Sequence, residues 1–204
     1  MWGSSLIFLK HHGKINEKGD VDISLWFGIG GRTMDLNLQI TDMAGARPEH
    51  STVIVNFVSA VRKQLRNSTC YVFSDNVQYR WHAKDGEEKT VMPDASINCR
   101  VKSRRGNTFI DAPRFVMEVL SDSTEKYDRT EKKEIYREQE IDEYWIVDWR
   151  KKQVEIYNLD YDEEQKPQYY LWKTISEENK GELKMVHFPH VMITFDELFE
   201  EVDL

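Results

Sequence analysis

The chain has 204 residues, of which 40% are hydrophobic and 12% aromatic, so it can bury a core of domain size and is not an intrinsically disordered chain. Its formal net charge of −8 argues against nonspecific binding of nucleic acid over the whole surface. No stretch approaches the roughly 18 consecutive apolar residues of a membrane span, and the N-terminal SLIFL is shorter than the roughly 7–15 apolar residues of a secretory signal, so we expect a cytoplasmic protein.

The first 49 residues give no readable succession of elements, and we separate them as an N-terminal segment from a domain over residues 50–204. That domain opens with STVIVNFVSAVRKQLR (51–66), whose apolar residues recur at helical spacing, with Ser51 as its expected N-terminal cap. The later elements are also readable. Strands are expected at 70–75, 77–82, 91–99, 114–120, 143–149 and 152–159, a helix at 128–140, and a further hairpin at 167–175 and 183–188.

This order of elements predicts an α/β (α+β) fold, with a mixed central sheet flanked by helices and an extra hairpin towards the C-terminus. Near the end, Thr194 and Glu197 have the S/T-x-x-E spacing of a helix capping box.

The predicted strand RFVMEVL (114–120) contains one carboxylate, Glu118, inside an otherwise apolar run. A buried carboxylate is costly unless a partner offsets its charge. Asp94, which follows Pro93 in the preceding strand, can meet Glu118 if the two strands are neighbours. Two converging carboxylates favour a cation between them, and Mg²⁺ takes oxygen ligands of this kind. The alternative is an ordinary ion pair with a nearby lysine or arginine, or a carboxylate bridged by water.

The next predicted helix supplies a candidate cation. Lys132 shares one helical face with Ile135, Tyr136 and Gln139, at spacings of three, four and seven residues. Because Ile135 and Tyr136 are the natural core-facing residues, Lys132 is expected to point inwards, towards the two acids. The alternative places Lys132 at the edge of this face, with its amine reaching water.

Two other features are less specific. The segment RVKSRR (100–105) is locally basic, and it is either a solvated loop or a surface that contacts phosphates. The two cysteines, Cys70 and Cys99, show neither CxxC nor CxxH spacing, so we expect both to be reduced and structural.

In combination, the segments MPDASINC, APRFVMEVLSDST and YDRTEKKEIYREQEIDEYWIVD resemble the Uma-type family of putative restriction endonucleases, in the PD-(D/E)XK nuclease superfamily. The similarity runs from about His50 to the C-terminus. It implies a restriction-endonuclease-like core and metal ligation by Asp94, Glu118 and the backbone carbonyl of Val119. Leu120 stands where the superfamily has its usual lysine, and the D-x-x-x-K-x-x-x-Y pattern puts the replacement at Lys132.

The resemblance further implies a DNA substrate, a Mg²⁺ or Mn²⁺ cofactor and a homodimer. It also implies an acidic residue on an N-terminal helix, for which Asp35 is the nearest candidate. His50 and Tyr136 are candidate accessory residues, and the candidate DNA-contacting residues are Arg100, Lys102, Arg104 and Arg105.

The sequence thus predicts a metal-dependent endonuclease, with Asp94 and Glu118 holding the metal and Lys132 orienting water or offsetting charge. Two alternatives stay open. One is a non-catalytic binding or assembly protein that keeps the nuclease fold, and the other is a phosphohydrolase acting on small substrates.

Overall fold

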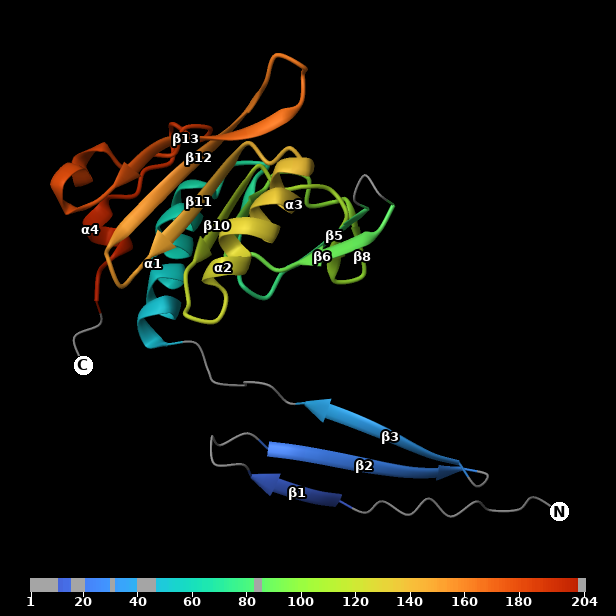
Figure 1. Ribbon diagram of the computed structural model, residues 1–204. Coiled ribbons are helices and arrows are strands. Elements are labelled where there is room, and N and C mark those ends of the chain that lie inside the picture. The colour runs from blue at the N-terminus through green and yellow to red at the C-terminus, as the bar shows by residue number, and fades with distance from the viewer. Residues whose placement is uncertain (1–10, 16–20, 30–31, 40–46, 83–85, 202–204) are drawn as a thin grey trace. The chain divides into compact units, whose positions relative to one another are not determined.

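A computed structural model describes residues 11–15, 21–29, 32–39, 47–82 and 86–201 (Figure 1). The backbone divides into two compact units, Met1–Gly45 and Ala46–Leu204. In the first unit, three strands form an antiparallel sheet in chain order: β1 (His11–Ile15), β2 (Val21–Ile29) and β3 (Arg32–Gln39).

The second unit is built on a six-stranded sheet. In spatial order its strands are β13 (Pro167–Ile175), β12 (Gln153–Tyr161), β11 (Glu143–Asp148), β10 (Phe115–Val119), β7 (Ala95–Asn98) and β4 (Tyr71–Ser74). The central strands β10 and β11 run parallel, whereas every other neighbouring pair is antiparallel. The predicted mixed sheet is therefore confirmed. The extra hairpin consists of β12 and β13 and not, as predicted, of residues 167–175 and 183–188.

Helix α1 (Pro48–Gln64) covers one face of this sheet together with the short helix α4 (Phe195–Leu198), which carries the predicted capping box. In this layer Phe57 of α1 stacks on Phe115 of β10, with 5.2 Å between ring centroids. The opposite face packs against a small second sheet. Its strands, in spatial order, are β6 (Glu88–Val91), β5 (Gln78–His82), β9 (Thr108–Phe109) and β8 (Arg104–Arg105).

Side chains alternate between these two faces along β10. Phe115, Met117 and Val119 belong to the core under α1, whereas Val116 and Leu120 belong to the core on the other side. Because alternate residues of a strand share a face, Glu118 lies on the face of Val116 and Leu120.

The first helix begins at Pro48, so the prediction that Ser51 caps it is wrong. Proline suits the first helical position, because the N–H that it lacks would have no partner within the helix. The N–H of Ser51 already donates to the carbonyl of Arg47 at 3.2 Å, inside the first turn. His50 therefore lies in the first turn of α1.

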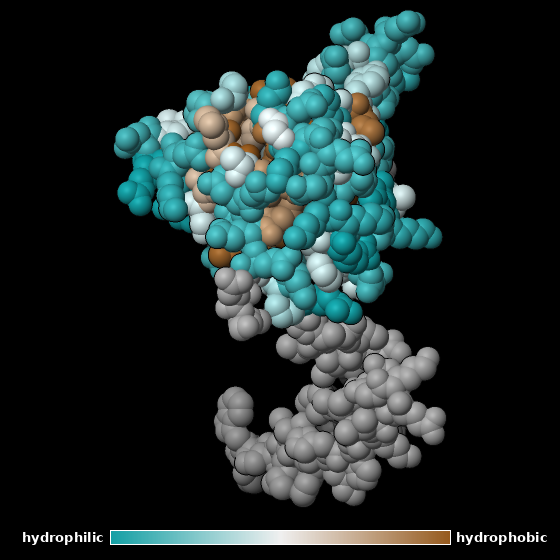
Figure 2. Space-filling model, turned by 90° about the vertical axis from the view of Figure 1, so that its left-hand side faces the viewer, coloured by the Kyte–Doolittle hydropathy of each residue, from teal (hydrophilic) through white to brown (hydrophobic). Residues whose placement is uncertain are grey.

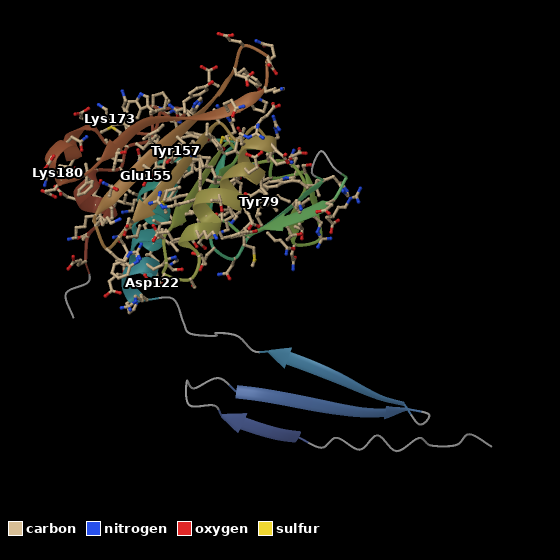
Figure 3. The ribbon with its side chains drawn as sticks, viewed as in Figure 1. Tyr79, Asp122, Glu155, Tyr157, Lys173 and Lys180 are labelled. Carbon is tan, nitrogen blue, oxygen red and sulfur yellow. A yellow bond between two sulfur atoms is a disulfide. The ribbon has the colours of Figure 1, made fainter. Side chains whose placement is uncertain are left out.

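The predicted helix over 128–140 is interrupted by a wider turn. It consists of α2 (Glu125–Tyr127), a π-helical turn (Asp128–Lys132) and α3 (Lys133–Glu138). The guanidinium of Arg129, within the π-helical turn, donates to both carboxylate oxygens of Glu155 on β12, at 2.9 and 3.0 Å. Glu155 also accepts a hydrogen bond from Tyr157, two residues along the same strand (Figure 3). Turns of this kind occur frequently at functional sites.

One predicted strand is wrong, because residues 183–188 form none. They follow a 3₁₀ helix (Glu177–Glu182) and pack as irregular chain, with Met185 and Phe188 in the core. The N–H groups of Val186 and His187 donate to the buried carboxylate of Glu143, at 3.1 and 2.9 Å. The carboxylate of Glu143 thus accepts the hydrogen bonds that a neighbouring strand would otherwise accept.

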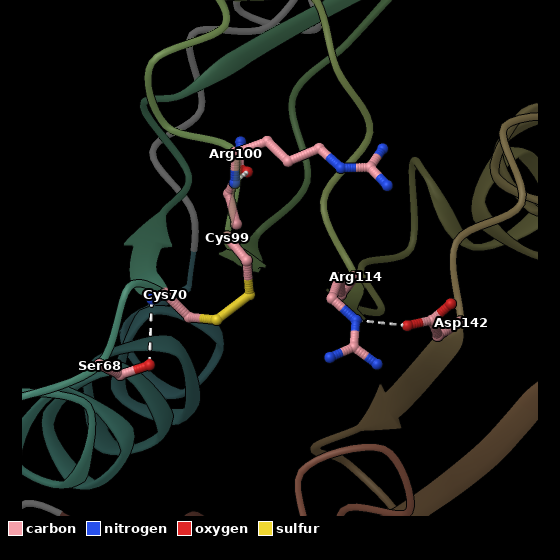
Figure 4. The surroundings of a disulfide bond; sticks show 7 residues. Ser68, Cys70, Cys99, Arg100, Arg114 and Asp142 are labelled. Atoms are coloured by element: carbon pink, nitrogen blue, oxygen red, sulfur yellow. Dashed lines mark hydrogen bonds and ion pairs between the residues drawn. A yellow bond between two sulfur atoms is a disulfide. The ribbon is translucent and has the colours of Figure 1, made fainter.

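The expectation that both cysteines are reduced is also wrong, because Cys70 and Cys99 form a disulfide (Figure 4). Tyr71 of β4 pairs with Asn98 of β7. Cys70 precedes Tyr71 and Cys99 follows Asn98, so in this antiparallel register the two cysteines lie opposite each other. The bond therefore joins two neighbouring antiparallel strands, a juxtaposition that cysteine spacing in the sequence cannot reveal.

The face of the second unit that Figure 2 shows is mostly hydrophilic, with a few apolar patches. No helix in the described part of the chain is both long and apolar enough to cross a membrane.

Candidate active site

The two predicted acids meet at one end of the β7–β10 pair. Met117 pairs with Ala95, so Glu118 and Asp94 fall in the next row of the antiparallel register. The backbone N–H of Val119 donates to Oδ2 of Asp94 at 2.7 Å, and the backbone N–H of Asp94 donates to Oε2 of Glu118 at 3.4 Å. A backbone N–H at the start of β7 and one at the end of β10 thus each bind the carboxylate from the other strand.

Lys132 points inwards to this pair. Its amine lies 2.9 Å from Oε2 of Glu118 and 3.0 Å from Oδ1 of Asp128, and only 15% of its side chain is exposed. The alternative in which Lys132 reaches bulk water does not describe this geometry. The π-helical turn that contains both Asp128 and Lys132 places them on the same side of the helix.

Asp128 is a member of the site that the sequence reasoning did not single out. It is 1% exposed, and the hydroxyl of the buried Tyr144 donates to its backbone carbonyl at 3.0 Å. On the same helix face, Tyr136 donates a short hydrogen bond of 2.5 Å to Oε1 of Glu118. The signal was present in the sequence, because Asp128, Lys132 and Tyr136 follow one another at four-residue intervals.

Negative charge exceeds positive charge in this cluster, since the carboxylates of Asp94, Glu118 and Asp128 surround one ammonium group. Glu118 has no exposed surface, and its burial, reinforced by the two other acids, raises its pKa to about 8 against the opposing effects of Lys132 and Tyr136. Burial lowers the pKa of Lys132, but the charges of Glu118 and Asp128 outweigh it, so its pKa is raised and the amine is protonated.

His50 reaches the site from the first turn of α1. Its Nε2 lies 3.4 Å from Oδ2 of Asp94, and its side chain is 13% exposed. Burial lowers its pKa, but hydrogen bonding to Asp94 and to the backbone of Val119, with the charge of Asp75, raises it above the ordinary value. Nδ1 of His50 is buried and has no hydrogen-bond partner within the described residues.

Asp35 lies on β3, opposite Trp26, and belongs to the first unit. The acidic residue was expected on an N-terminal helix, and at this position the chain forms a strand.

The basic segment lies away from the two acids. It starts after Asn98, at the end of β7 opposite to Asp94, and its four cations are exposed: Arg100, Lys102, Arg104 and Arg105. Arg104 and Arg105 form β8, which pairs with β9 across a turn at Gly106, so the segment is a small hairpin as well as a loop.

A family model named Uma2, with the description "Putative restriction endonuclease", matches residues 35–183. The chain belongs to the Uma2 family. The resemblance inferred from the sequence is therefore confirmed, and the match includes the row of Asp94 and Glu118, the helix that carries Lys132, and the hairpin of β12 and β13.

Two further proteins are similar to this Uma2 chain. An uncharacterized protein of Synechocystis is 27% identical over 121 residues, which are 59% of this chain and 62% of the relative, so the similarity spans less than two thirds of its length. A crystal structure from Anabaena variabilis, described as a putative nuclease belonging to DUF820, superimposes with a TM-score of 0.59 at 16% identity. It covers 84% of this chain and 87% of that one, and it confirms the restriction-endonuclease-like fold.

In this Uma2 chain the residue two positions after Glu118 contributes no charge. Leu120 is fully buried among apolar residues, its N–H donates to the carbonyl of Val147, and its own carbonyl accepts from the indole of Trp149. The only ammonium within ion-pair distance of Glu118, among the described residues, belongs to Lys132.

Proposed function

We propose that this Uma2 chain is an endonuclease that hydrolyses DNA phosphodiester bonds with a divalent metal ion. The observation that carries the proposal is the convergence of Asp94, Glu118 and Lys132, which come from two strands and a helix and meet at one end of the sheet. The family to which the chain belongs supports a nuclease with DNA as its substrate.

The donor set fits a hard divalent cation. Asp94, Glu118 and the carbonyl of Val119 would hold Mg²⁺ or Mn²⁺ through oxygen atoms, and a bound cation would add positive charge to a cluster in which three acids lie around one lysine. Within the described residues, no three or more His, Cys, Asp or Glu side chains are grouped so that they could hold a metal ion. Mg²⁺ commonly uses one or two carboxylates and keeps several waters. When bound, the ion supplies a water of lowered pKa and offsets charge on a phosphoryl oxygen.

Three side chains around the two acids would orient the substrate, the water and the metal ligands. Lys132, protonated and fixed between Glu118 and Asp128, would donate to a phosphate oxygen or hold the attacking water, and it would offset charge that develops in the transition state. Tyr136 keeps one oxygen of Glu118 occupied and so fixes the direction of the other. His50 would contact the phosphate beside Asp94.

The test is cleavage of supercoiled plasmid DNA with Mg²⁺ or Mn²⁺ by the wild type and by Asp94→Asn, Glu118→Gln and Lys132→Met. Lys180→Met is the matched control, because Lys180 pairs with exposed acids on another part of the surface (Figure 3). We expect each site variant to lose at least about 100-fold in rate, and the control to match the wild type. Equal cutting by all five proteins would refute the site.

The two other functions correspond to different outcomes of the same assay. No cutting by the wild type, together with no calorimetric binding of Mn²⁺, would indicate a non-catalytic binding or assembly protein. Hydrolysis of bis(p-nitrophenyl) phosphate without cutting of DNA would indicate a phosphohydrolase for small substrates.

A further inference from the structure

A hollow lies at the edge of the six-stranded sheet, away from the row of Asp94 and Glu118. Its volume is about 530 Å³, and it opens between the edge strand β4 and the basic segment that follows β7. The residues that line it are aromatic, apolar or basic: Tyr71, Phe73, Val101, Lys102, Arg104 and Phe109. No acidic residue lines it.

The aromatic rings of this basic–aromatic hollow form a row. Phe109 and Phe73 lie 5.3 Å apart and Phe73 and Tyr71 lie 6.5 Å apart, measured between ring centroids, with the second pair inclined by only 30°. Phe109 is buried, whereas Tyr71 is 42% exposed at the outer end of the row. A planar apolar ligand can therefore stack at the Tyr71 end without displacing the core.

The cations around the hollow have no acidic partners. Arg62 of α1 lies over the ring of Tyr71, 5.6 Å from its centroid, and Lys102 and Arg104 line the hollow itself. In the described part of the chain, none of these three makes an ion pair, whereas Arg129, Arg137 and Arg150 are each held by carboxylates. Cations without an ion pair beside the exposed ring of Tyr71, on a chain of net charge −8, indicate an anionic and aromatic ligand.

We propose that the basic–aromatic hollow binds single-stranded DNA, with an unstacked base on Tyr71 and the flanking phosphates on Arg62, Lys102 and Arg104. A base in a duplex has both faces covered by its neighbours, so only an unpaired strand can present a face to the ring. The proposal deepens the proposed function, on which it rests, because it names the form of the substrate: a DNA with a single-stranded region.

The hollow and the acidic cluster are at opposite ends of the same edge strand. Ser74 of β4 pairs with Ala95, the neighbour of Asp94, and Tyr71 pairs with Asn98. Three residues of strand span about 10 Å. A strand held at Tyr71 could thus follow β4 and reach the level of Asp94 within a few nucleotides.

The test is the affinity for a fluorescein-labelled oligonucleotide of about 12 thymidines, and for a hairpin duplex, measured by anisotropy in EDTA at several salt concentrations. We expect the wild type to bind the single strand more tightly than the duplex. Tyr71→Ala should weaken single-strand binding about tenfold with an unchanged salt slope, because stacking carries no charge. The double variant Lys102→Gln/Arg104→Gln should reduce the log–log salt slope by about 1.4.

The matched controls are Tyr161→Ala, which removes a tyrosine of similar exposure (46%) at the end of β12, and Arg80→Gln, which removes an exposed arginine paired with Glu88. Both should bind like the wild type. Wild-type affinity in Tyr71→Ala and in the double variant, or tighter binding of the duplex, would overturn the proposal.

Failure of this inference is distinguishable from failure of the proposed function. Binding is measured without metal, and we expect Asp94→Asn to bind the single strand like the wild type although it does not cut. Binding without any cleavage would refute the nuclease and leave the hollow as a DNA site. Cleavage by a protein whose hollow variants bind normally would refute the hollow alone.

Discussion

Glu118 is a residue whose burial costs folding free energy and whose carboxyl group is the proposed metal ligand. It is fully buried, yet it touches Lys132, Tyr136 and the backbone of Asp94. Each contact offsets part of the cost of burial, but the nearby acids leave its pKa raised to about 8. Without metal, the raised pKa of this carboxyl group favours its protonated form more than in an exposed glutamate.

That proton leads to the first prediction, that binding of a divalent cation is coupled to proton release. Because the cation needs the carboxylate form, its affinity should rise with pH from about 6 to 8 and level off above. Calorimetric titration of Mn²⁺ in two buffers of different ionisation enthalpy measures the protons released. Glu118→Gln should release none at this site. Tyr136→Phe, which removes a hydrogen bond to the carboxylate, should move the rise to higher pH. An affinity independent of pH in the wild type would contradict the prediction.

Asp128 is predicted to position Lys132 and not to bind the metal. In Asp128→Asn the ammonium loses one of its two carboxylates, so we expect the cleavage rate at saturating metal to fall about tenfold. The affinity for Mn²⁺ should stay within about threefold of the wild type, because Asp94 and Glu118 are unchanged. A loss of metal affinity as large as the loss of rate would instead make Asp128 a ligand.

The sequence identified a site residue where a charged side chain interrupted an apolar strand or an apolar helix face. Glu118 stood out in an apolar strand, and Lys132 stood out on an apolar helix face, and the structure brings the two together. Asp128 was missed, because an acid at the start of a predicted helix is ordinary there. Its backbone carbonyl accepts a hydrogen bond from Tyr144, sixteen residues away, a contact that the spacing along one helix does not reveal.

At the scale of elements, the disulfide fastens the edge strand β4 to β7. The two cysteines are 29 residues apart, and β5 and β6 lie between them in the sequence. The pairing could not be read from the sequence, because it depends on a strand register that skips these two elements. The irregular segment 183–188 was misread for a similar reason, since Glu143 from a distant strand binds its N–H groups.

Reduction of the Cys70–Cys99 bond is predicted to destabilise the second unit. Opening a loop of this length should lower the free energy of unfolding by about 3–4 kcal/mol, because the unfolded chain regains conformational freedom. Urea unfolding with and without a phosphine reductant measures the difference. The double variant Cys70→Ala/Cys99→Ala should unfold near the reduced wild type and be insensitive to the reductant. Two free thiols in the unreduced protein would contradict the bond.

At the scale of the whole molecule, the six-stranded sheet has two unequal edges. The edge strand β4 is short and flanked by cations, whereas β13 is nine residues long and exposes three apolar side chains in succession: Tyr170 (48%), Leu171 (52%) and Trp172 (37%). A long edge strand with exposed apolar residues can pair with another chain unless something blocks it. Within the described residues, β12 is the only strand that pairs with β13.

We therefore expect the homodimer implied by the sequence to form through β13. Antiparallel pairing of two copies about Leu171 would place Tyr170 of one chain opposite Trp172 of its partner, a favourable cross-strand aromatic pair. Light scattering after gel filtration should give about twice the 24.2 kDa mass of the chain. Leu171→Glu would set two carboxylates against each other at the two-fold axis, so it should give the monomer mass. Met192→Glu, at a 72% exposed methionine outside any strand, should remain dimeric. A monomeric wild type, or a dimeric Leu171→Glu, would show that this edge does not pair two copies.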